Sequence, residues 1–182
     1  MVATTLPLGA RALDFDLEGT DGRRHRLAGI RGEKATLVMF ICNHCPYVKA
    51  VLDDIIRDAA ELEADGVASV AIMPNDTEAY PADSFENMKR LAETKRFPFP
   101  YIIDRSQETA RSYGALCTPD FLGFDADLRL QYHGRIYPVR SLVRVAGSRR
   151  ELFEAMQAIA RTGKAPTEQH PPMGCSIKWR GE

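Results

Sequence analysis

An unbroken apolar run, Leu37 to Ile41, leads directly into Cys42-Asn43-His44-Cys45, and this junction constrains the fold of the chain most. An apolar run of this length predicts a central strand that is buried on both faces. Apolar residues then recur at helical spacing from Tyr47 to Leu62, which predicts an amphipathic helix that ends near Asp65-Gly66. The CxxC pair therefore lies where a buried strand passes into the first turn of a helix.

The CxxC pair predicts redox thiol chemistry. Two thiols at this spacing can close a disulfide within one helical turn, and the helix N-terminus favours the thiolate at the first of them, Cys42. The alternatives are half of a zinc site or two accidental thiols. Zinc requires a second pair at similar spacing, whereas Cys117 and Cys175 stand apart from each other, although a four-thiol site is geometrically conceivable.

His44 lies between the two cysteines. An imidazolium there would stabilise a neighbouring thiolate and make the disulfide form more oxidising. The alternative is a solvated loop histidine, but we expect a tuning role because the ring cannot lie far from sulfur. The other histidines, His25, His133 and His170, lack metal-ligand spacing and are expected at the surface.

The bulk properties of the chain favour a single cytoplasmic domain. Its 182 residues are enough for one sizeable core, and 24 basic against 25 acidic residues give no field that recruits nucleic acid or an anionic membrane. Residues 1–10 lack a basic start followed by an apolar run, so no signal peptide is expected. Four cysteines are too few for a disulfide scaffold, and paired cysteines in a reducing compartment are more often catalytic or metal-binding.

The remaining patterns predict one α/β domain over residues 1–182, with a core at about 8–163 and a C-terminal extension at about 164–182. An N-terminal β-hairpin is expected around the turn Thr20-Asp21-Gly22, and a second buried strand from Val67 to Met73. Asp83, with Glu86 three residues on, is expected to cap a helix. Ser148 to Glu151 resembles a capping box that opens a last helix.

Cys117-Thr118-Pro119 stands just ahead of a hairpin predicted from Phe121 to His133. The order of strand, CxxC helix, strand, helix, then Thr-Pro leading into a hairpin and a final helix resembles the thioredoxin superfamily. The resemblance implies that Pro119 is cis and packs against the CxxC. It also implies that Thr118 and Pro119 form the substrate-facing loop, where Thr118 offers its backbone to an extended substrate. The alternative is an ordinary X-Pro turn.

The likeness is greatest to the peroxiredoxin-like, AhpC/TSA-related branch of that superfamily, and it extends from about Leu8 to Trp179. Three pieces look like the recurring set of that branch: Phe40 to Tyr47 with the CNHC motif, Tyr132 to Arg135, and Gly174 to Trp179. The resemblance implies a thioredoxin-like fold, a central mixed β-sheet flanked by helices.

The chain departs from true peroxiredoxins at two positions. Those proteins carry Thr or Ser three residues before the attacking cysteine and Pro seven before it, where this chain has Met39 and Ala35. Peroxidase sites also use an arginine beside the thiolate, and Arg135 is expected instead at the surface or against the tail. A thiol peroxidase, in which Cys42 becomes a sulfenic acid that Cys45 resolves, therefore remains the alternative function.

The chain departs from thioredoxin as well. Thioredoxin has a Trp before the first cysteine and a buried acid in the strands beneath the site, whereas Ile41 precedes Cys42 here and the strand has no acid. The sequence therefore assigns no proton acceptor to Cys45. Glu78 and Glu86 are candidates, and solvated positions are the alternative for both.

The expected function is thiol–disulfide exchange in redox homeostasis, in which Cys42 attacks a substrate disulfide and Cys45 resolves the mixed disulfide. Cys117 and Cys175 are candidate auxiliary thiols, with a buried apolar role for Cys117 and an inert thiol in a docked tail for Cys175 preferred. The expected partners are protein or small-molecule disulfides, peroxides under the peroxidase alternative, and an electron donor such as a thioredoxin/reductase or glutathione system. No cofactor or resident metal is expected, and a non-enzymatic metal-binding module is the third alternative.

Overall fold

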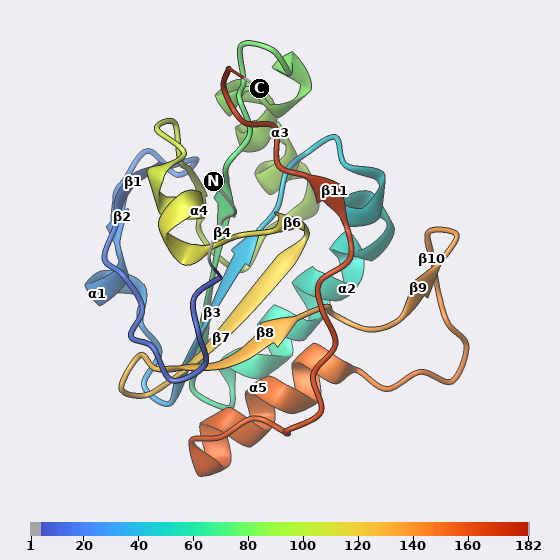
Figure 1. The fold of residues 1–182 in the computed structure, drawn as a ribbon. Coiled ribbons are helices and arrows are strands. Elements are labelled where there is room, and N and C mark those ends of the chain that lie inside the picture. The colour runs from blue at the N-terminus through green and yellow to red at the C-terminus, as the bar shows by residue number, and fades with distance from the viewer. Residues whose placement is uncertain (1–4, 182) are drawn as a thin grey trace.

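The computed structural model describes residues 5–181, and within them seven strands form one mixed sheet. Residues 1–4 and 182 lie outside this range, including the start of the segment expected to lack a signal peptide. The sheet order is β2 (Arg24–Arg26), β1 (Asp16–Gly19), β5 (Tyr101–Ile103), β4 (Val67–Met73), β3 (Ala35–Phe40), β7 (Asp120–Asp125) and β8 (Leu130–Gly134) (Figure 1). The helices are α1 (Leu27–Ile30), α2 (Pro46–Glu63), α3 (Phe85–Lys95), α4 (Glu108–Tyr113) and α5 (Glu151–Thr162), with a 3₁₀ turn η1 (Pro81–Asp83).

Strand β3 lies in the interior of this sheet, and all six of its side chains are buried. It pairs in parallel with β4 and antiparallel with β7, so both of its edges are hydrogen-bonded. Successive side chains of a strand point to opposite faces. Leu37 and Met39 accordingly pack into one apolar cluster, and Val38 and Phe40 into another.

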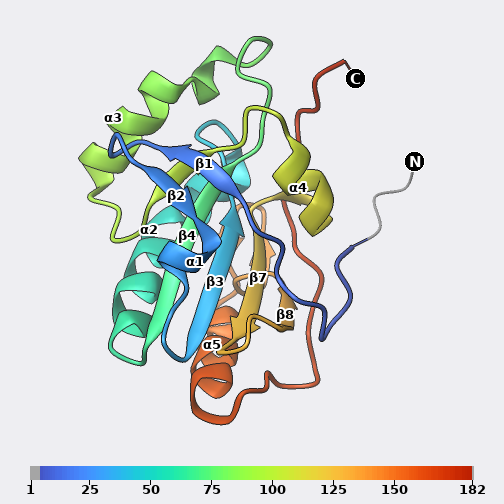
Figure 2. The same ribbon diagram turned by 90° about the vertical axis from the view of Figure 1, so that its left-hand side faces the viewer.

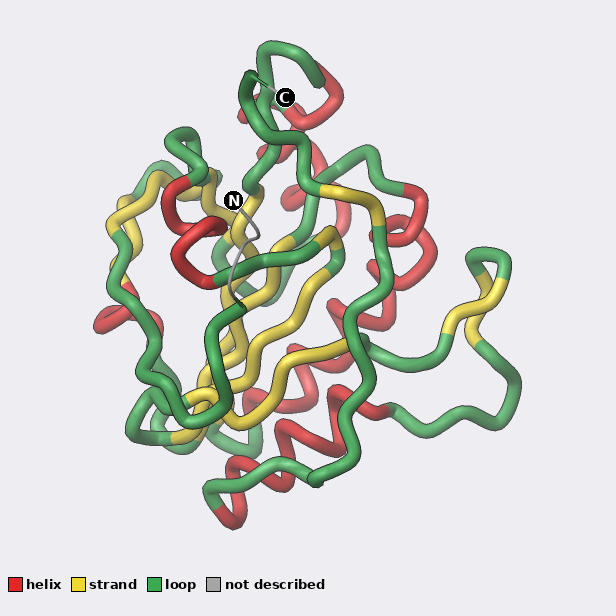
Figure 3. The backbone as a smooth tube through the Cα atoms, in the orientation of Figure 1, coloured by secondary structure: helices red, strands yellow, loops and turns green. Residues whose placement is uncertain are grey.

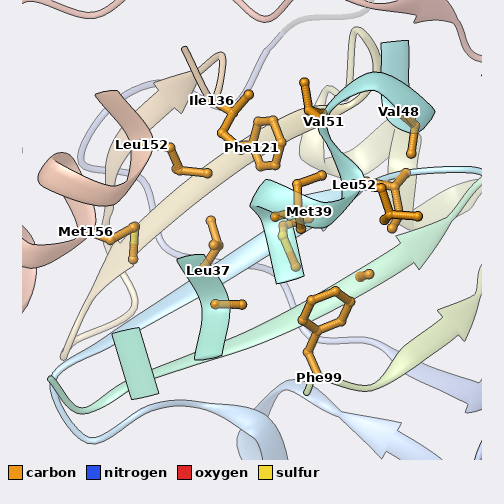
Figure 4. Packing of buried hydrophobic residues seen from close by; sticks show 14 of the residues in the cluster. Leu37, Met39, Val48, Val51, Leu52, Phe99, Phe121, Ile136, Leu152 and Met156 are labelled. Atoms are coloured by element: carbon orange, nitrogen blue, oxygen red, sulfur yellow. The ribbon is translucent and has the colours of Figure 1, made fainter. Parts of the chain in front are cut away.

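The two faces of the sheet are covered by different helices. Helices α2, α3 and α5 pack on one face, where Val51, Leu152 and Met156 surround Leu37 and Phe121 (Figure 4). Helices α1 and α4 cover the other face, together with the N-terminal segment and part of the C-terminal segment (Figure 2). The expected central mixed sheet with helices on both faces is confirmed.

The N-terminal hairpin is confirmed, with β1 antiparallel to β2, and β1 also joins the main sheet through β5. The capping assignments were wrong at two helices. Ser84, rather than Asp83, caps α3, because its side chain accepts the amide of Asn87 at 3.3 Å. Helix α5 begins at Glu151, and Ser148 instead accepts a hydrogen bond from the Arg144 guanidinium.

Two short pairings lie outside the main sheet. A small hairpin of β9 (Val139–Arg140) and β10 (Val143–Arg144), which the sequence did not predict, projects beside α2 and α5 (Figure 3). In the second pairing, β11 (Cys175–Ser176) of the C-terminal segment runs antiparallel to β6 (Cys117–Thr118) (Figure 1). The C-terminal extension therefore folds back over the domain. Within residues 5–181, no helix combines the length and apolarity needed to cross a membrane.

Candidate active site

The CxxC loop lies at the end of β3, where the chain enters α2. Cys45 is the residue that precedes the helix, and Pro46 takes the first helical position, where its missing amide costs no hydrogen bond. The Cys42 residue is 1% exposed and the Cys45 residue 0% exposed, and all four cysteines of the chain are free thiols. The CxxC pair thus lies at a helix N-terminus, as the sequence predicts, and both of its thiols are buried.

The Thr118-Pro119 peptide bond is cis, as the resemblance implies. Thr118 is fully buried and contacts both sulfurs. The Sγ atom of Cys42 lies 3.4 Å from Thr118 Oγ1, and the Sγ atom of Cys45 lies 3.2 Å from the Thr118 carbonyl oxygen. The structure therefore brings the Cys42–Cys45 pair together with Thr118 and Pro119, which lie more than seventy positions further along the chain.

A buried carboxylate that the sequence did not predict lies beneath the CxxC loop. Asp83 is 0% exposed, and its Oδ1 accepts the backbone amides of Asn43 at 2.8 Å and of His44 at 3.1 Å. Its Oδ2 is hydrogen-bonded to the Asn75 amide at 2.8 Å and to His44 Nδ1 at 2.5 Å. These four partners use all the lone-pair sites of one carboxylate, so Asp83 anchors the loop between the two cysteines.

His44 is held on two sides. Its Nδ1 pairs with Asp83, and its ring stacks on that of Tyr80 with the centroids 5.6 Å apart and the planes at 10°. One ring nitrogen of His44, the Cys42 sulfur and an Asp83 oxygen all lie within 4.8 Å of one another. The ring is therefore fixed close to the Cys42 sulfur. The two exposed candidates for a proton acceptor, Glu78 and Glu86, face solvent.

The surroundings of the two sulfurs favour a negative charge on Cys45. The hydrogen bond from Cys42 holds the pKa of Cys45 well below its ordinary value, although burial opposes this, and Cys175 and the Val48 amide act in the same direction. The same hydrogen bond raises the pKa of Cys42, and burial and the Asp83 charge add to the rise. Amides at the helix N-terminus act on both sulfurs, because the Cys45 amide lowers the pKa of Cys42, as expected, and the Val48 amide lowers the pKa of Cys45.

The C-terminal segment covers the dithiol. The β11 pairing places Cys175 opposite Thr118, and the Cys175 sulfur lies 2.7 Å from that of Cys45. A Cβ atom on Gly174 would lie 2.1 Å from the Thr118 carbonyl oxygen, so only glycine permits this approach. The edge that the resemblance assigns to an extended substrate is thus occupied by the tail of the chain itself.

Cys117 is buried on the other side of the cis-proline loop, where its thiol donates to the Pro119 carbonyl at 3.4 Å. Burial raises the pKa of Cys117 to about 12, so it is a protonated thiol at neutral pH. Beside it, the buried Asp120 accepts the Leu116 amide at 2.8 Å and pairs with His133 at 2.9 Å. His133 is therefore a support of this loop rather than the surface residue that was expected.

Local patterns in the sequence did not predict the roles of Asp83 and Asp120 in the site, or the contact of Cys175 with Cys45. A signal for Asp83 was present: Ser84 is itself a good N-cap, which leaves the preceding acid without a local partner. The Asp120–His133 pair and the Cys45–Cys175 contact form only when the cis-proline loop packs against other segments of the folded chain.

The sequence profile of the AhpC/TSA family matches residues 8–143, which is most of the chain. The chain belongs to the AhpC/TSA family. This agrees with the resemblance drawn from the CNHC motif and its surroundings. The matched residues include the CxxC loop, α2 and the Thr118-Pro119 loop, whereas the tail with Cys175 lies beyond them.

Solved structures of other proteins share this fold. An uncharacterized conserved protein from Geobacillus kaustophilus is 43% identical, with a TM-score of 0.91 over 97% of this chain and 94% of that one. The thioredoxin domain of a thiol-disulfide oxidoreductase from Bacteroides vulgatus has a TM-score of 0.60 at 15% identity over 71% of this chain and 89% of its own. The fold is thioredoxin-like.

A relative of known chemical class is a thiol-disulfide oxidoreductase. Thiol-disulfide oxidoreductase ResA of Geobacillus thermodenitrificans (strain NG80-2) is 26% identical over 117 residues, which cover 61% of this chain and 59% of ResA. The chain thus matches about three fifths of the length of that relative. It is related to thiol–disulfide oxidoreductases.

Proposed function

We propose that this AhpC/TSA-family protein is a thiol–disulfide oxidoreductase in which Cys42 and Cys45 form the working dithiol. The observation that carries the proposal is the contact of both sulfurs with Thr118, the residue before the cis proline. A substrate strand that pairs with Thr118 would bring its disulfide to these two sulfurs.

In the first step, the Cys42 proton passes to Cys45 along the hydrogen bond that joins them. The resulting Cys42 thiolate attacks one sulfur of the substrate disulfide, a mixed disulfide forms, and the other substrate sulfur leaves as a thiolate that takes up a proton. The Cys45 thiol then donates to the Thr118 carbonyl oxygen, which lies 3.2 Å away.

In the second step, Cys45 loses its proton and attacks Cys42, which releases the reduced substrate and leaves a Cys42–Cys45 disulfide. We assign the relay of this proton to His44, because Asp83 fixes its Nδ1 and one ring nitrogen lies within 4.8 Å of the neighbouring Cys42 sulfur. A cytoplasmic thiol system, a thioredoxin/reductase or glutathione, would return the disulfide to the dithiol.

A thiol peroxidase is the second candidate, favoured by membership of the AhpC/TSA family. Two buried residues of β3 argue against it. Peroxiredoxins carry a polar Thr or Ser at the position of Met39 and a Pro at the position of Ala35. The Arg135 guanidinium also does not point to the thiols, because it donates two hydrogen bonds, of 2.9 and 2.8 Å, to the Glu151 carboxylate. The metal-binding alternative was expected at the four cysteines, whereas the group with ligand spacing among the described residues is Cys42, His44 and Asp83, and Asp83 already has four partners.

The test is disulfide exchange with a model protein disulfide, using Cys42→Ser and Cys45→Ser in a Cys175→Ser background, so that the tail thiol cannot act in place of either cysteine. Cys42→Ser should abolish turnover, and Cys45→Ser should accumulate a mixed disulfide through Cys42 because no resolving thiol follows. Cys117→Ser is the matched control and should retain exchange. Full exchange activity in folded Cys42→Ser protein would overturn the proposal.

A further inference from the structure

A third thiol is built into the dithiol site. Strand β11 pairs Cys175 with Thr118 and so aims its side chain at the CxxC. The Sγ atoms of Cys175 and Cys45 lie 2.7 Å apart, only about 0.6 Å more than the length of a disulfide bond. Cys45 therefore contacts two thiols, Cys42 on its own loop and Cys175 on the tail.

The tail is held in place on both sides of Cys175: by the close approach of Gly174 before it, and by contacts of residues 177–179 after it. Lys178 donates its amide to Asn75 Oδ1 at 2.9 Å, and its carbonyl accepts the Asp76 amide at 2.9 Å. Ile177 is 4% exposed within the apolar cluster that includes α4, and the Arg111 guanidinium lies 4.1 Å above the Trp179 ring. These contacts hold the Cys175 backbone in register from both sides.

We propose that Cys175 is a third redox-active thiol, which exchanges disulfide bonds with Cys45. The oxidised chain then distributes between a Cys42–Cys45 disulfide and a Cys45–Cys175 disulfide that ties β11 over the site. This inference rests on the proposed function for the formation of the first disulfide.

The exchange is an isomerisation and needs no further oxidant. Cys175 loses its proton and its thiolate attacks the Cys45 sulfur of the Cys42–Cys45 disulfide. The Cys45–Cys175 bond forms, the Cys42–Cys45 bond breaks, and Cys42 leaves as a thiolate that takes up the proton. The number of disulfides is unchanged, and Cys42 becomes a free thiol while the tail is covalently closed.

The experiment uses the full chain oxidised with a small-molecule disulfide, oxidised glutathione, followed by acid quenching, alkylation and non-reducing tryptic mapping. Cys42 and Cys45 share the peptide 35–49, whereas Cys175 lies in 165–178. A Cys42–Cys45 bond therefore stays within one peptide, and a Cys45–Cys175 bond joins two. In the oxidised wild type we expect to detect peptides 35–49 and 165–178 joined by the Cys45–Cys175 bond. In oxidised Cys42→Ser this bond should be nearly the only disulfide.

The matched control moves the tail thiol by one residue, in the double variant C175S/S176C, so that it points to the other face of β11. This variant should lose the link between 35–49 and 165–178 at the same local thiol concentration. Cys42→Ala repeats the test if Cys42→Ser fails to fold, as judged by circular dichroism.

Two results distinguish this inference from the proposed function. A wild type that forms the Cys42–Cys45 disulfide but never joins peptides 35–49 and 165–178 overturns the inference and leaves the proposed function standing. A wild type that joins these peptides, yet shows no exchange with a protein disulfide, supports the third thiol and contradicts the proposed function.

Discussion

At the scale of single residues, Asp83 has the most demanding role in the site. It is buried and satisfies two amides of the CxxC loop, the Asn75 side chain and the His44 ring. The loss of a charged partner from buried hydrogen bonds is costly, on the order of 1.5–3 kcal/mol for each bond to a charged group. Asp83 is a positioning residue, because it acts on the sulfurs through the loop and through His44.

Replacing Asp83 with Asn should lower the free energy of unfolding by about 2–4 kcal/mol, because one carboxylate acceptor becomes a donor facing other donors. It should also change the shape of the pH profile of disulfide exchange, which a merely structural loss would scale uniformly. Chemical denaturation and exchange rates between pH 5 and 9 measure the two effects. Glu86→Gln, an exposed acid three residues away, is the control. Asp83→Asn with an unchanged pH profile would contradict this role.

The lowered pKa of Cys45 predicts a thiolate in the reduced protein at neutral pH. Thiols of the unfolded chain titrate near about 8.5, so the pKa of Cys45 is lower in the folded state. The contribution of Cys45 to stability is then fully present above that unfolded pKa and is lost as pH falls through the folded pKa.

The measurement is the ultraviolet absorbance of thiolate as a function of pH. We expect one thiolate to be present at pH 7 in the wild type and in Cys117→Ser, because burial raises the pKa of Cys117 to about 12. The signal should disappear in Cys45→Ser. A neutral-pH signal that survives Cys45→Ser and is lost in Cys42→Ser would place the charge on the other sulfur.

At the scale of elements, the site is the meeting point of three segments: the β3–α2 junction, the β6 cis-proline loop and β11. The first two are fixed by the main fold, since β3 has neighbours on both edges and β7 follows directly after Pro119. Strand β11 is two residues long and pairs on one side only. It is therefore the element that must move if a substrate strand is to reach Thr118.

Gly174→Ala should release β11 from β6. The added Cβ would lie 2.1 Å from the Thr118 carbonyl oxygen, and overpacking of this kind costs about 1–3 kcal/mol. This cost corresponds to a roughly 5- to 150-fold larger population of molecules in which β11 is detached from β6. The alkylation of Cys42 and Cys45 in the reduced protein should be faster by a similar factor. Gly29→Ala, where no atom lies within 4 Å of the added Cβ, is the control. Equal alkylation rates in the wild type and Gly174→Ala would contradict the account.

The sequence predicted the elements whose signals are local. The apolar run at Leu37 predicted β3 to within two residues, and the helical spacing after Tyr47 predicted α2 to within one, because burial on both faces or on one face leaves its own pattern in each segment. The cis-proline loop was predicted by resemblance. The contacts of Asp83 and Cys175 were not predicted, because they join segments 40 and 130 residues apart through side chains that local patterns leave free.

At the scale of the whole molecule, the tail joins the site to the core. Ile177 packs in the apolar cluster with Val38, Phe40 and Tyr113, so the docking of β11 and the packing of the sheet stabilise each other. Burial of one Ile side chain contributes about 1.5–3 kcal/mol.

Removal of residues 173–182 should therefore lower the free energy of unfolding by at least about 1.5–3 kcal/mol and expose the dithiol at the same time. Thermal denaturation and thiol alkylation measure the two effects on one preparation. Ile177→Ala should reproduce most of the stability loss, whereas Met173→Ala, at an exposed residue, should not. A truncated chain with wild-type stability would show that the tail does not pack as described.

The most direct test of thiol–disulfide exchange compares two single-turnover rates for the reduced protein. One is the rate of forming the Cys42–Cys45 disulfide with a model protein disulfide, and the other is the rate with hydrogen peroxide, with Cys42→Ser as the blank. We expect fast oxidation by the protein disulfide and slow oxidation by peroxide. Much faster oxidation by peroxide would contradict it and make the protein a thiol peroxidase.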